Sequence, residues 1–506
     1  MNNEVKPIAM YLPQFHRVKE NDEWWGEGFT EWTAVEKAVP LFEGHKQPKR
    51  PMNDYTYDLL QKETMEWQAQ LMRKHGVYGM CFYHYWFENG RQILEKPAEN
   101  LLKWTDIDMP FCFCWANESW VRTWSVMKGQ NVWTSSYEPQ SKEEGDGVLL
   151  RQCYGVQEDW ETHFEYLVSF FQDKRYIKKD NKPVILFYKV SDIECIDEMI
   201  AYWNQLAIEK GFEGVYVIGA NCGEEEIEFM DAELVTEPQT TIRREFISQF
   251  MHKEHLDISR YLSYDEVVNA SLKYNKKTDK KTYYGGFVKY DDTARHGKNG
   301  AVIYNDTPEK FKVYLAELYA KNASLKNEFI FINAWNEWGE GMYLEPDQEY
   351  GEEYLQAFRY AEKHYQQEMY KYQDGIDKAN RDGMRLQVER YKKELQIADQ
   401  WLVANTIGTD ITFTLRQSGY KKVAVYGMGI LGKRLVDELL NNDFDVCCID
   451  RRATRLNLKS PAFLPMDIPS DVDVVIVTLP HIFEQIEEDI SQYYDGKILS
   501  LEQLFE

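Results

Sequence analysis

The chain has 506 residues, too many for one compact core, so two or three domains are expected. It carries 59 lysines and arginines against 84 aspartates and glutamates, a net charge of −25. A surface this acidic repels nucleic-acid phosphates and anionic lipid headgroups, which makes both poor partners. Contents of 43% hydrophobic and 28% charged residues are ordinary for globular chains, which excludes disordered, collagen-like and disulfide-scaffold proteins.

The amino terminus, Met1 to Pro7, lacks both the basic start and the apolar stretch of a secretory signal. No apolar run approaches the ~20 residues of a membrane-crossing helix, so we expect a soluble cytoplasmic protein without membrane insertion. The eight cysteines lie mostly inside apolar runs, which predicts reduced thiols. Cys112 and Cys114 share one strand face, but no second Cys or His pair completes a zinc set, so no metal site is predicted.

Short apolar runs alternate with amphipathic stretches over the first 350 residues, which is typical of βα units around a parallel sheet. Eight strands are predicted, near residues 8–12, 79–83, 111–115, 184–188, 215–219, 232–235, 284–288 and 329–332. Helices are predicted over 56–75, 158–171, 193–210 and 308–321, the last with Thr307 as N-cap and Pro308 at its first position. Residues 1–365 are therefore expected to form an α/β fold, a TIM-type (β/α)8 barrel.

Barrels of this kind carry their chemistry on the loops that leave the carboxyl ends of the strands. Here those loops mix aromatic and polar residues, which suits a sugar: its flat C–H faces stack on rings, and its hydroxyls need Asn, Glu, Gln and His partners. The candidate sugar-binding residues are Tyr11, Gln14, His16, His84, Tyr85, Trp86, Trp115, Asn117, Glu118, Asn333, Trp335, Asn336 and Trp338. Each ring could instead pack a core, and His16 and His84 could be ordinary hydrogen-bonded histidines.

Two glutamates three residues apart, Glu337 and Glu340, follow the eighth predicted strand and are embedded among tryptophans. Glycoside cleavage needs such a pair, because one carboxyl must protonate the departing oxygen while the other stays ionised as base or nucleophile. Two exposed helix glutamates are the usual explanation of an arbitrary E-x-x-E. The flanking tryptophans and the position after the last strand favour a catalytic pair.

Several motifs resemble one family in order along residues 7–365. They are Tyr11-Leu12-Pro13-Gln14-Phe15-His16, Trp25-Gly26-Glu27-Gly28-Phe29-Thr30-Glu31-Trp32, Cys114-Trp115-Ala116-Asn117-Glu118 and Asn333-Ala334-Trp335-Asn336-Glu337-Trp338-Gly339-Glu340-Gly341, followed by Leu344-Glu345-Pro346. Together they resemble the glycosyltransferase WbsX-like family, which is related to the family 99 glycoside hydrolases. The matched motifs add Trp32 and Glu345 to the candidate substrate-binding residues.

The resemblance implies a (β/α)8 barrel that acts on mannose-type or related glycans with retention of anomeric configuration. It assigns Glu337 as the base toward the substrate's 2-hydroxyl, giving a 1,2-anhydro sugar, and Glu340 as general acid and then base. Gly339 departs from the hydrolases, which usually have histidine there, and this smaller residue implies a different pocket shape and a different sugar.

The chain changes character after the barrel. Residues 366–418 are predicted as a helical connector, and 419–506 as a small Rossmann-like half domain that opens with a strand, the glycines Gly427, Gly429 and Gly432, and a helix. Asp450 follows Gly427 by 450 − 427 = 23 residues and could hold a ribose, so a nucleotide is a possible ligand. The alternative is an α/β cap whose glycines serve packing, because no second half is present.

The first functional hypothesis is an enzyme that cleaves or transfers a glycosidic bond through the Glu pair, with no cofactor for the barrel chemistry. The missing export signal favours biosynthesis of a cell-surface polysaccharide such as lipopolysaccharide over digestion, with an oligosaccharide, a polysaccharide or a nucleotide sugar as partner. The second hypothesis is a non-catalytic glycan-binding or scaffold protein with a C-terminal interaction module.

Overall fold

The computed structural model divides into two compact units, Met1–Lys378 and Ala379–Glu506. It describes residues 5–121, 148–223, 226–246, 261–372, 392–393, 395–406, 410–450, 453 and 458–505. Within these residues, no helix combines the length and the apolar character that crossing a bilayer requires.

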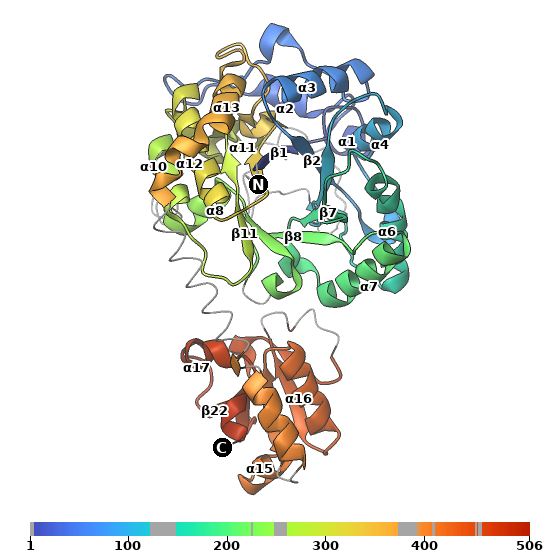
Figure 1. The fold of residues 1–506 in the computed structure, drawn as a ribbon, viewed down its shortest axis with the longest axis vertical. Coiled ribbons are helices and arrows are strands. Elements are labelled where there is room, and N and C mark those ends of the chain that lie inside the picture. Colours follow the sequence, from blue (N-terminus) through green and yellow to red (C-terminus); the bar gives the residue numbers. More distant parts are fainter. Residues whose placement is uncertain are drawn as a thin grey trace. The chain divides into compact units, whose positions relative to one another are not determined.

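The first unit is built on a ring of parallel strands (Figure 1). In spatial order the strands are β11 (Lys281–Tyr284), β9 (Ala232–Val235), β8 (Tyr216–Ala220), β7 (Lys182–Phe187), β3 (Phe111–Trp115), β2 (Gly79–His84), β1 (Lys6–Tyr11), β15 (Phe329–Asn333) and β12 (Gly286–Phe287). Only Gly285 separates β11, which pairs with β9, from β12, which pairs with β15, so one segment closes the ring. This arrangement confirms the predicted barrel.

The barrel strands are apolar runs buried along nearly their whole length, as expected for a parallel sheet covered on both faces. Gly285 lies close to the backbone of both neighbouring strands. A Cβ atom there would lie 2.8 Å from the Val235 carbonyl oxygen and 3.1 Å from that of Phe331. The missing side chain therefore permits the closure of the ring.

Helices surround the strands (Figure 1). The longer ones are α3 (Lys62–Lys74), α4 (Lys96–Lys103), α6 (Gln157–Phe171), α7 (Ile196–Glu209), α10 (Tyr264–Lys273), α12 (Pro308–Ser324) and α13 (Glu353–His364). Thr307 caps α12 as predicted, its side chain accepting a hydrogen bond from the Lys310 backbone N–H. Shorter helices at the strand ends are α1 (Lys19–Trp25), α2 (Glu31–Lys37), α8 (Gln239–Thr241) and α11 (Thr293–His296).

Short strands complete the first unit. They are β4 (Trp120–Val121) with β5 (Val148–Leu150), β6 (Lys178–Lys179) on β7, the sheet of β10 (Tyr261–Ser263), β14 (Val302–Tyr304) and β13 (Tyr290–Asp291), and the pair β16 (Asn336–Glu337) and β17 (Met342–Tyr343). The antiparallel β16–β17 pair folds back the segment that carries the Glu pair, with Glu337 opposite Met342.

The second unit holds a five-stranded parallel sheet in the order β20 (Ala462–Phe463), β19 (Asp445–Ile449), β18 (Lys422–Tyr426), β21 (Val474–Val477) and β22 (Lys497–Ser500). Its helices include α15 (Ile411–Gln417), α16 (Ile430–Leu440) and α17 (Phe483–Ile490).

Residues 373–391 of the predicted connector lie outside the described residues. At its far end, Trp401 and Ile411 share a core with β18, so that stretch packs with the second unit. The boundaries 365 and 418 stay predictions.

Candidate active site

A cavity of about 220 Å³ opens at the carboxyl ends of the barrel strands. Its described lining combines strand residues with residues from the loops that follow them. Three glutamates and one arginine from three separate segments converge in it: Glu31, Arg295, Glu337 and Glu340. This convergence is what the barrel architecture predicts for a functional mouth.

The Arg295 guanidinium binds all three carboxylates. Its Nε donates to Glu31 Oε1 at 2.8 Å, its Nη1 to Glu340 Oε1 at 2.7 Å, and its Nη2 to Glu337 Oε2 at 2.7 Å. Nη2 also lies 2.6 Å from Glu31 Oε1. The planar fork of donors suits this task, because neighbouring nitrogens can hold two carboxylates at fixed positions.

Burial sets the electrostatics of the pair. The side chain of Glu337 is 7% exposed and that of Glu340 is 22% exposed. Burial raises the pKa of Glu337 to about 8, against the opposing pull of Arg295, and Glu340 and Glu31 raise it further. The pKa of Glu340 is also raised, first by burial. A raised pKa brings a carboxyl closer to the neutral range in which it can exchange protons, which acid–base chemistry requires.

Glu345, a carboxylate outside the Arg295 cluster, fixes the loop that carries Glu337 and Glu340. It accepts hydrogen bonds from the indole N–H of Trp335 at 2.9 Å and of Trp338 at 2.7 Å. Tyr57 and Gln68 donate to it as well, each at 2.7 Å. Burial raises the pKa of Glu345 to about 7 despite these four donors. Both tryptophans that flank the Glu pair are therefore held from behind the cavity wall.

Asn336 holds the same loop to β1. Its Oδ1 accepts from the Leu12 backbone N–H at 2.8 Å, and its Nδ2 donates to the Leu12 carbonyl at 3.0 Å. The side chain thus bonds to the backbone as a neighbouring strand would, and it fixes the position of the adjacent Glu337.

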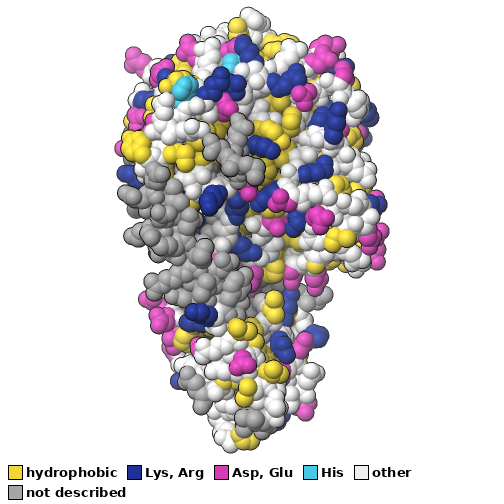
Figure 2. Space-filling view, in the orientation of Figure 1, with side chains coloured by type: hydrophobic (Ala, Val, Ile, Leu, Met, Phe, Trp, Pro, Cys, Tyr) yellow, Lys and Arg dark blue, Asp and Glu magenta, His cyan; other side chains and the backbone are white. Residues whose placement is uncertain are grey.

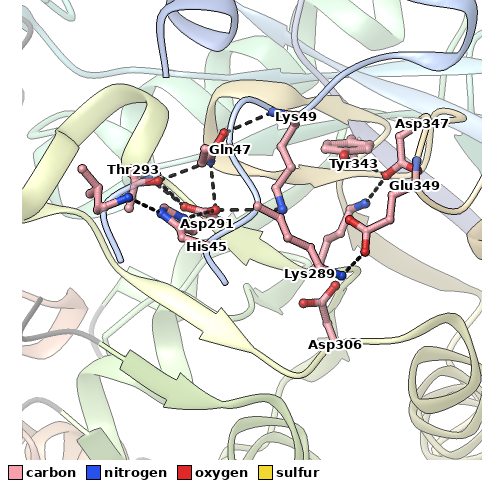
Figure 3. A network of polar contacts seen from close by, with 12 residues as sticks. His45, Gln47, Lys49, Lys289, Asp291, Thr293, Asp306, Tyr343, Asp347 and Glu349 are labelled. Carbon is pink, nitrogen blue, oxygen red and sulfur yellow. Dashed lines mark hydrogen bonds and ion pairs between the residues drawn. The ribbon is translucent and has the colours of Figure 1, made fainter. Parts of the chain in front are cut away.

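A buried polar network supports the segment that carries Arg295 (Figure 3). Asp291 Oδ2 accepts from Gln47 at 2.9 Å and from His45 Nε2 at 3.0 Å, while Asp291 Oδ1 binds the Thr293 hydroxyl. The Leu41 backbone N–H donates to His45 Nδ1, so Nε2 carries the proton given to Asp291. These bonds anchor the start of α11.

The same figure shows a second part of the network, around Lys289. Its ammonium lies 2.8 Å from Asp347 Oδ2 and 3.8 Å from the centroid of the Tyr343 ring. Tyr343 also donates to Asp347 at 2.9 Å, and it belongs to β17, the strand paired with the Glu337 strand. The Lys289–Asp347 ion pair is buried, and Tyr343 adds a hydrogen bond and a cation–π contact to it. These contacts constrain β17 and, through it, the strand that carries Glu337.

Gly339, the departure from the hydrolase pattern, has a direct structural reason. A Cβ atom at this position would lie 1.9 Å from Glu31 Oε1 and 2.7 Å from Arg295 Nε. The Glu31 carboxylate and the Arg295 guanidinium thus occupy the space that a side chain would need. The glycine is required for the contact between them and the Glu pair.

Six of the predicted barrel residues line the cavity: Gln14, Tyr85, Glu118, Asn333, Glu337 and Glu340. The other eleven do not line it and belong to the packing behind it: Tyr11, His16, Trp32, His84, Trp86, Trp115, Asn117, Trp335, Asn336, Trp338 and Glu345. Hydrogen bonds behind the cavity hold several of them in place. Trp32, for example, donates to the Tyr57 carbonyl at 2.9 Å, and Asn117 donates to the Lys189 carbonyl at 2.7 Å.

His84 is a predicted residue of the barrel mouth that packs in the core instead. Its Nε2 lies 2.8 Å from Nε2 of His163, and burial lowers the pKa of His84 to about 3. Trp86 stacks on the His163 ring at a centroid distance of 4.4 Å. A smaller hollow beside these rings is lined by Trp86, Trp115 and His163 and is separate from the cavity with the Glu pair.

The cavity is also lined by residues that were not among the predicted site residues, namely Arg295, Glu31, Tyr188, Gln239 and His296. Glu31 lies in a motif that carried the family resemblance, so a signal was present. Arg295 follows no motif and is 42 residues before Glu337, a separation at which sequence spacing says nothing about contact.

The predicted nucleotide loop lies in the second unit. A Cβ atom at Gly432 would lie 1.9 Å from the Gly427 carbonyl oxygen, so this glycine permits close packing of α16 on the loop, whereas Gly429 has open space around it. Asp450 is 1% exposed, and its Oδ2 accepts from the Met428 backbone N–H at 3.0 Å. The Asp450 carboxylate therefore binds the backbone of the glycine loop. Nucleotide binding by these residues stays a prediction.

Replacing Gly339 by alanine tests the packing of the cluster. The new methyl group displaces Glu31 from Arg295, so we expect Gly339→Ala to lower the stability of the first unit by about 1–3 kcal/mol in thermal or denaturant unfolding. Adding Glu31→Asp, which shortens the carboxylate arm by one methylene, should restore part of that loss. Unfolding of Gly339→Ala identical to wild type would contradict the described contact.

The chain has relatives among known proteins. The protein WxcX of Xanthomonas campestris pv. campestris, described as uncharacterized, is 31% identical over 366 residues, which make 70% of this chain and 49% of WxcX. The chain thus spans about half the length of the curated relatives it matches.

Solved structures with a similar fold include a GH99 endo-α-mannosidase from Bacteroides thetaiotaomicron, at 14% identity and a TM-score of 0.44, covering 72% of this chain and 98% of that one. A glycoside hydrolase-like protein matches at 12% identity and a TM-score of 0.43, covering 71% and 94%. Residues 7–358 match the family described as Glycosyltransferase WbsX. This chain belongs to the glycosyltransferase WbsX family.

Proposed function

We propose that the first unit is a carbohydrate-active enzyme that cleaves or transfers a glycosidic bond with retention, using Glu337 and Glu340. The observation that carries the proposal is the binding of both carboxyls to one guanidinium inside a cavity at the barrel mouth. Two carboxyls at adjacent nitrogens of one arginine can both reach a single sugar ring. Membership of the WbsX family supports a glycan as the substrate.

The steps follow the roles that the family resemblance implies. Glu337 takes the proton of the donor's 2-hydroxyl, and the freed oxygen attacks C1 while Glu340 protonates the departing glycosidic oxygen. Glu340 then removes a proton from water or from an acceptor hydroxyl, which attacks C1 and opens the 1,2-anhydro ring. The 2-oxygen regains its proton from Glu337. Two inversions at C1 give net retention, and both carboxyls return to their starting states.

Arg295 acts as a positioning residue in this scheme. It holds each carboxyl through one oxygen, which leaves the other oxygen of each to meet substrate. Its positive charge also limits the rise of the pKa that burial imposes on Glu337. The guanidinium thus makes Glu337 easier to ionise by opposing the rise of its pKa. It also fixes the distance between the two carboxyls.

The charge of the cavity favours a glycoside over a nucleotide sugar as donor. Its described lining contains five glutamates, and its one arginine is already bound by three of them. On the face shown in Figure 2, Lys and Arg are interspersed with Asp and Glu. A diphosphate would meet repulsion in this lining, whereas the hydroxyls of a glycan can donate to carboxylates. Cell-surface polysaccharide biosynthesis and a cytoplasmic location stay predictions.

Removing either carboxyl tests catalysis against simple binding. We expect Glu337→Gln and Glu340→Gln each to lower turnover about 10²–10⁴-fold, because each removes one proton transfer. The assay is a screen of mannose-type and related oligosaccharides, with the anomeric configuration of the product followed by NMR. Glu309→Gln, a matched change on an exposed side chain of α12, is the control. Unchanged turnover in both site variants would leave a glycan-binding protein as the explanation.

The pH profile tests the role of Glu337. As a base it must be ionised, but in wild type Glu340 must also be protonated, so the profile of Glu340→Gln on a substrate with a para-nitrophenyl leaving group, which needs no general acid, isolates Glu337. There kcat/KM should rise with pH as Glu337 ionises, and burial places this rise above the ordinary range of a glutamate. If Glu337 instead donated the proton, kcat/KM would fall over the same range. A falling profile of Glu340→Gln in initial-rate measurements between pH 5 and pH 9 would therefore contradict the assignment.

A further inference from the structure

His296, at the end of α11, lines the cavity but is not one of the four residues of the Arg295 cluster, which are Glu31, Arg295, Glu337 and Glu340. Apart from Arg295, it is the only side chain of the described lining that can carry a positive charge. Three carboxylates already bind Arg295, whereas the side chain of His296 is 27% exposed. His296 is therefore available to bind a substrate group.

Asp292 orients the His296 ring. Asp292 Oδ2 lies 3.1 Å from His296 Nδ1 and accepts a hydrogen bond from the Tyr290 hydroxyl at 3.0 Å. Asp292 Oδ1 accepts from the Ala301 backbone N–H at 2.6 Å, so both oxygens of this buried carboxylate are held. Because an ionised carboxylate only accepts hydrogen bonds, Nδ1 keeps its proton. Nε2, at the opposite edge of the ring, is left to meet a group in the cavity.

The Asp292–His296 pair lies beside Glu340. The helix α11 packs on the turn Trp338–Glu340, which carries this carboxyl. Burial raises the pKa of Glu340 and Arg295 lowers it, and the next largest effects come from Asp292 and His296. The charges with the largest effect on the pKa of Glu337 all belong to the Arg295 cluster. Packing and electrostatics thus both place His296 next to the second carboxyl of the pair.

The proposed roles of the two carboxyls indicate which sugar meets His296. Glu337 contacts the 2-hydroxyl of the donor, whereas Glu340 contacts the glycosidic oxygen that joins the donor to the leaving sugar. A side chain beside Glu340 is therefore close to the leaving sugar, or to the acceptor sugar that takes its place. A hydroxyl of this sugar suits Nε2 in either protonation state, because it can donate to the neutral ring and accept from the protonated one.

We propose that His296, oriented by Asp292, binds the sugar on the leaving-group and acceptor side of the site, with Nε2 hydrogen-bonded to one of its hydroxyls. This inference rests on the proposed function, because the roles of Glu337 and Glu340 orient the substrate. It deepens that function by assigning a binding site for a second sugar. An acceptor sugar held there competes with water, because its reacting hydroxyl is already positioned.

The partition of one donor between two acceptors tests the proposal. The donor is para-nitrophenyl α-D-mannopyranoside, and the acceptors are water and added methyl α-D-mannopyranoside. Both acceptors give their proton to Glu340, so an effect on Glu340 cancels in the ratio of transfer to hydrolysis. We expect His296→Phe, which keeps a ring but removes both nitrogens, to lower this ratio about 5–50-fold, the effect of losing one hydrogen bond to the sugar.

Two further variants and a control make the test specific. His296→Gln places an amide group near the position of Nε2 and should retain part of the ratio. Asp292→Asn removes the charge that orients the ring and should lower the ratio less than His296→Phe does. His364→Phe is the matched control, because His364 binds the Tyr360 carbonyl on α13 and is not part of the described cavity lining. An unfolded fraction reduces both products equally and leaves the ratio unchanged.

The outcomes separate this inference from the proposed function. A ratio that His296→Phe leaves at the wild-type value overturns the assigned contact, while the Glu pair keeps its role. Wild type that releases para-nitrophenol but forms no transfer product at any acceptor concentration overturns it as well. If wild type turns over the donor no faster than Glu337→Gln does, the proposed function fails and the inference falls with it.

Discussion

One guanidinium shared by three carboxylates, two of them buried, is the constraint on which the site depends. Arg295 comes from α11, Glu31 from the start of α2, and Glu337 and Glu340 from the segment after β15. No two of these three segments are adjacent in sequence. Carboxylates this close and this buried repel one another, and the shared cation makes their approach favourable. Losing it would leave several buried charges uncompensated.

The surrounding structure keeps this arrangement in place through separate anchors. Glu345 binds the two tryptophans beside the Glu pair, Asn336 bonds the same loop to β1, and Asp291 fixes the start of the helix that carries Arg295. Each anchor acts on a different segment of the cluster. Because the supporting groups are buried and hydrogen-bonded, the reactive carboxyls are held before any substrate arrives, which lowers the cost of orientation.

The sequence predicted the strands and the Glu pair because both leave local signals: short apolar runs at regular spacing, and two acids set among tryptophans after the last strand. It could not separate residues that line the cavity from those just behind it. Trp86 and Tyr85 are neighbours, yet Tyr85 lines the cavity and Trp86 stacks on His163. Arg295 left no local signal, because its role comes from a contact between distant segments.

The most direct test of the account is a double-mutant cycle between Arg295 and Glu340. Arg295→Lys keeps the charge but cannot bind two carboxylates at fixed positions, so it should lower kcat/KM strongly by itself. If Arg295 acts by positioning Glu340, the double variant with Glu340→Gln should lose little more activity than the worse single variant. Losses that simply multiply would show that the two residues act independently, and would contradict the central role given to the shared guanidinium.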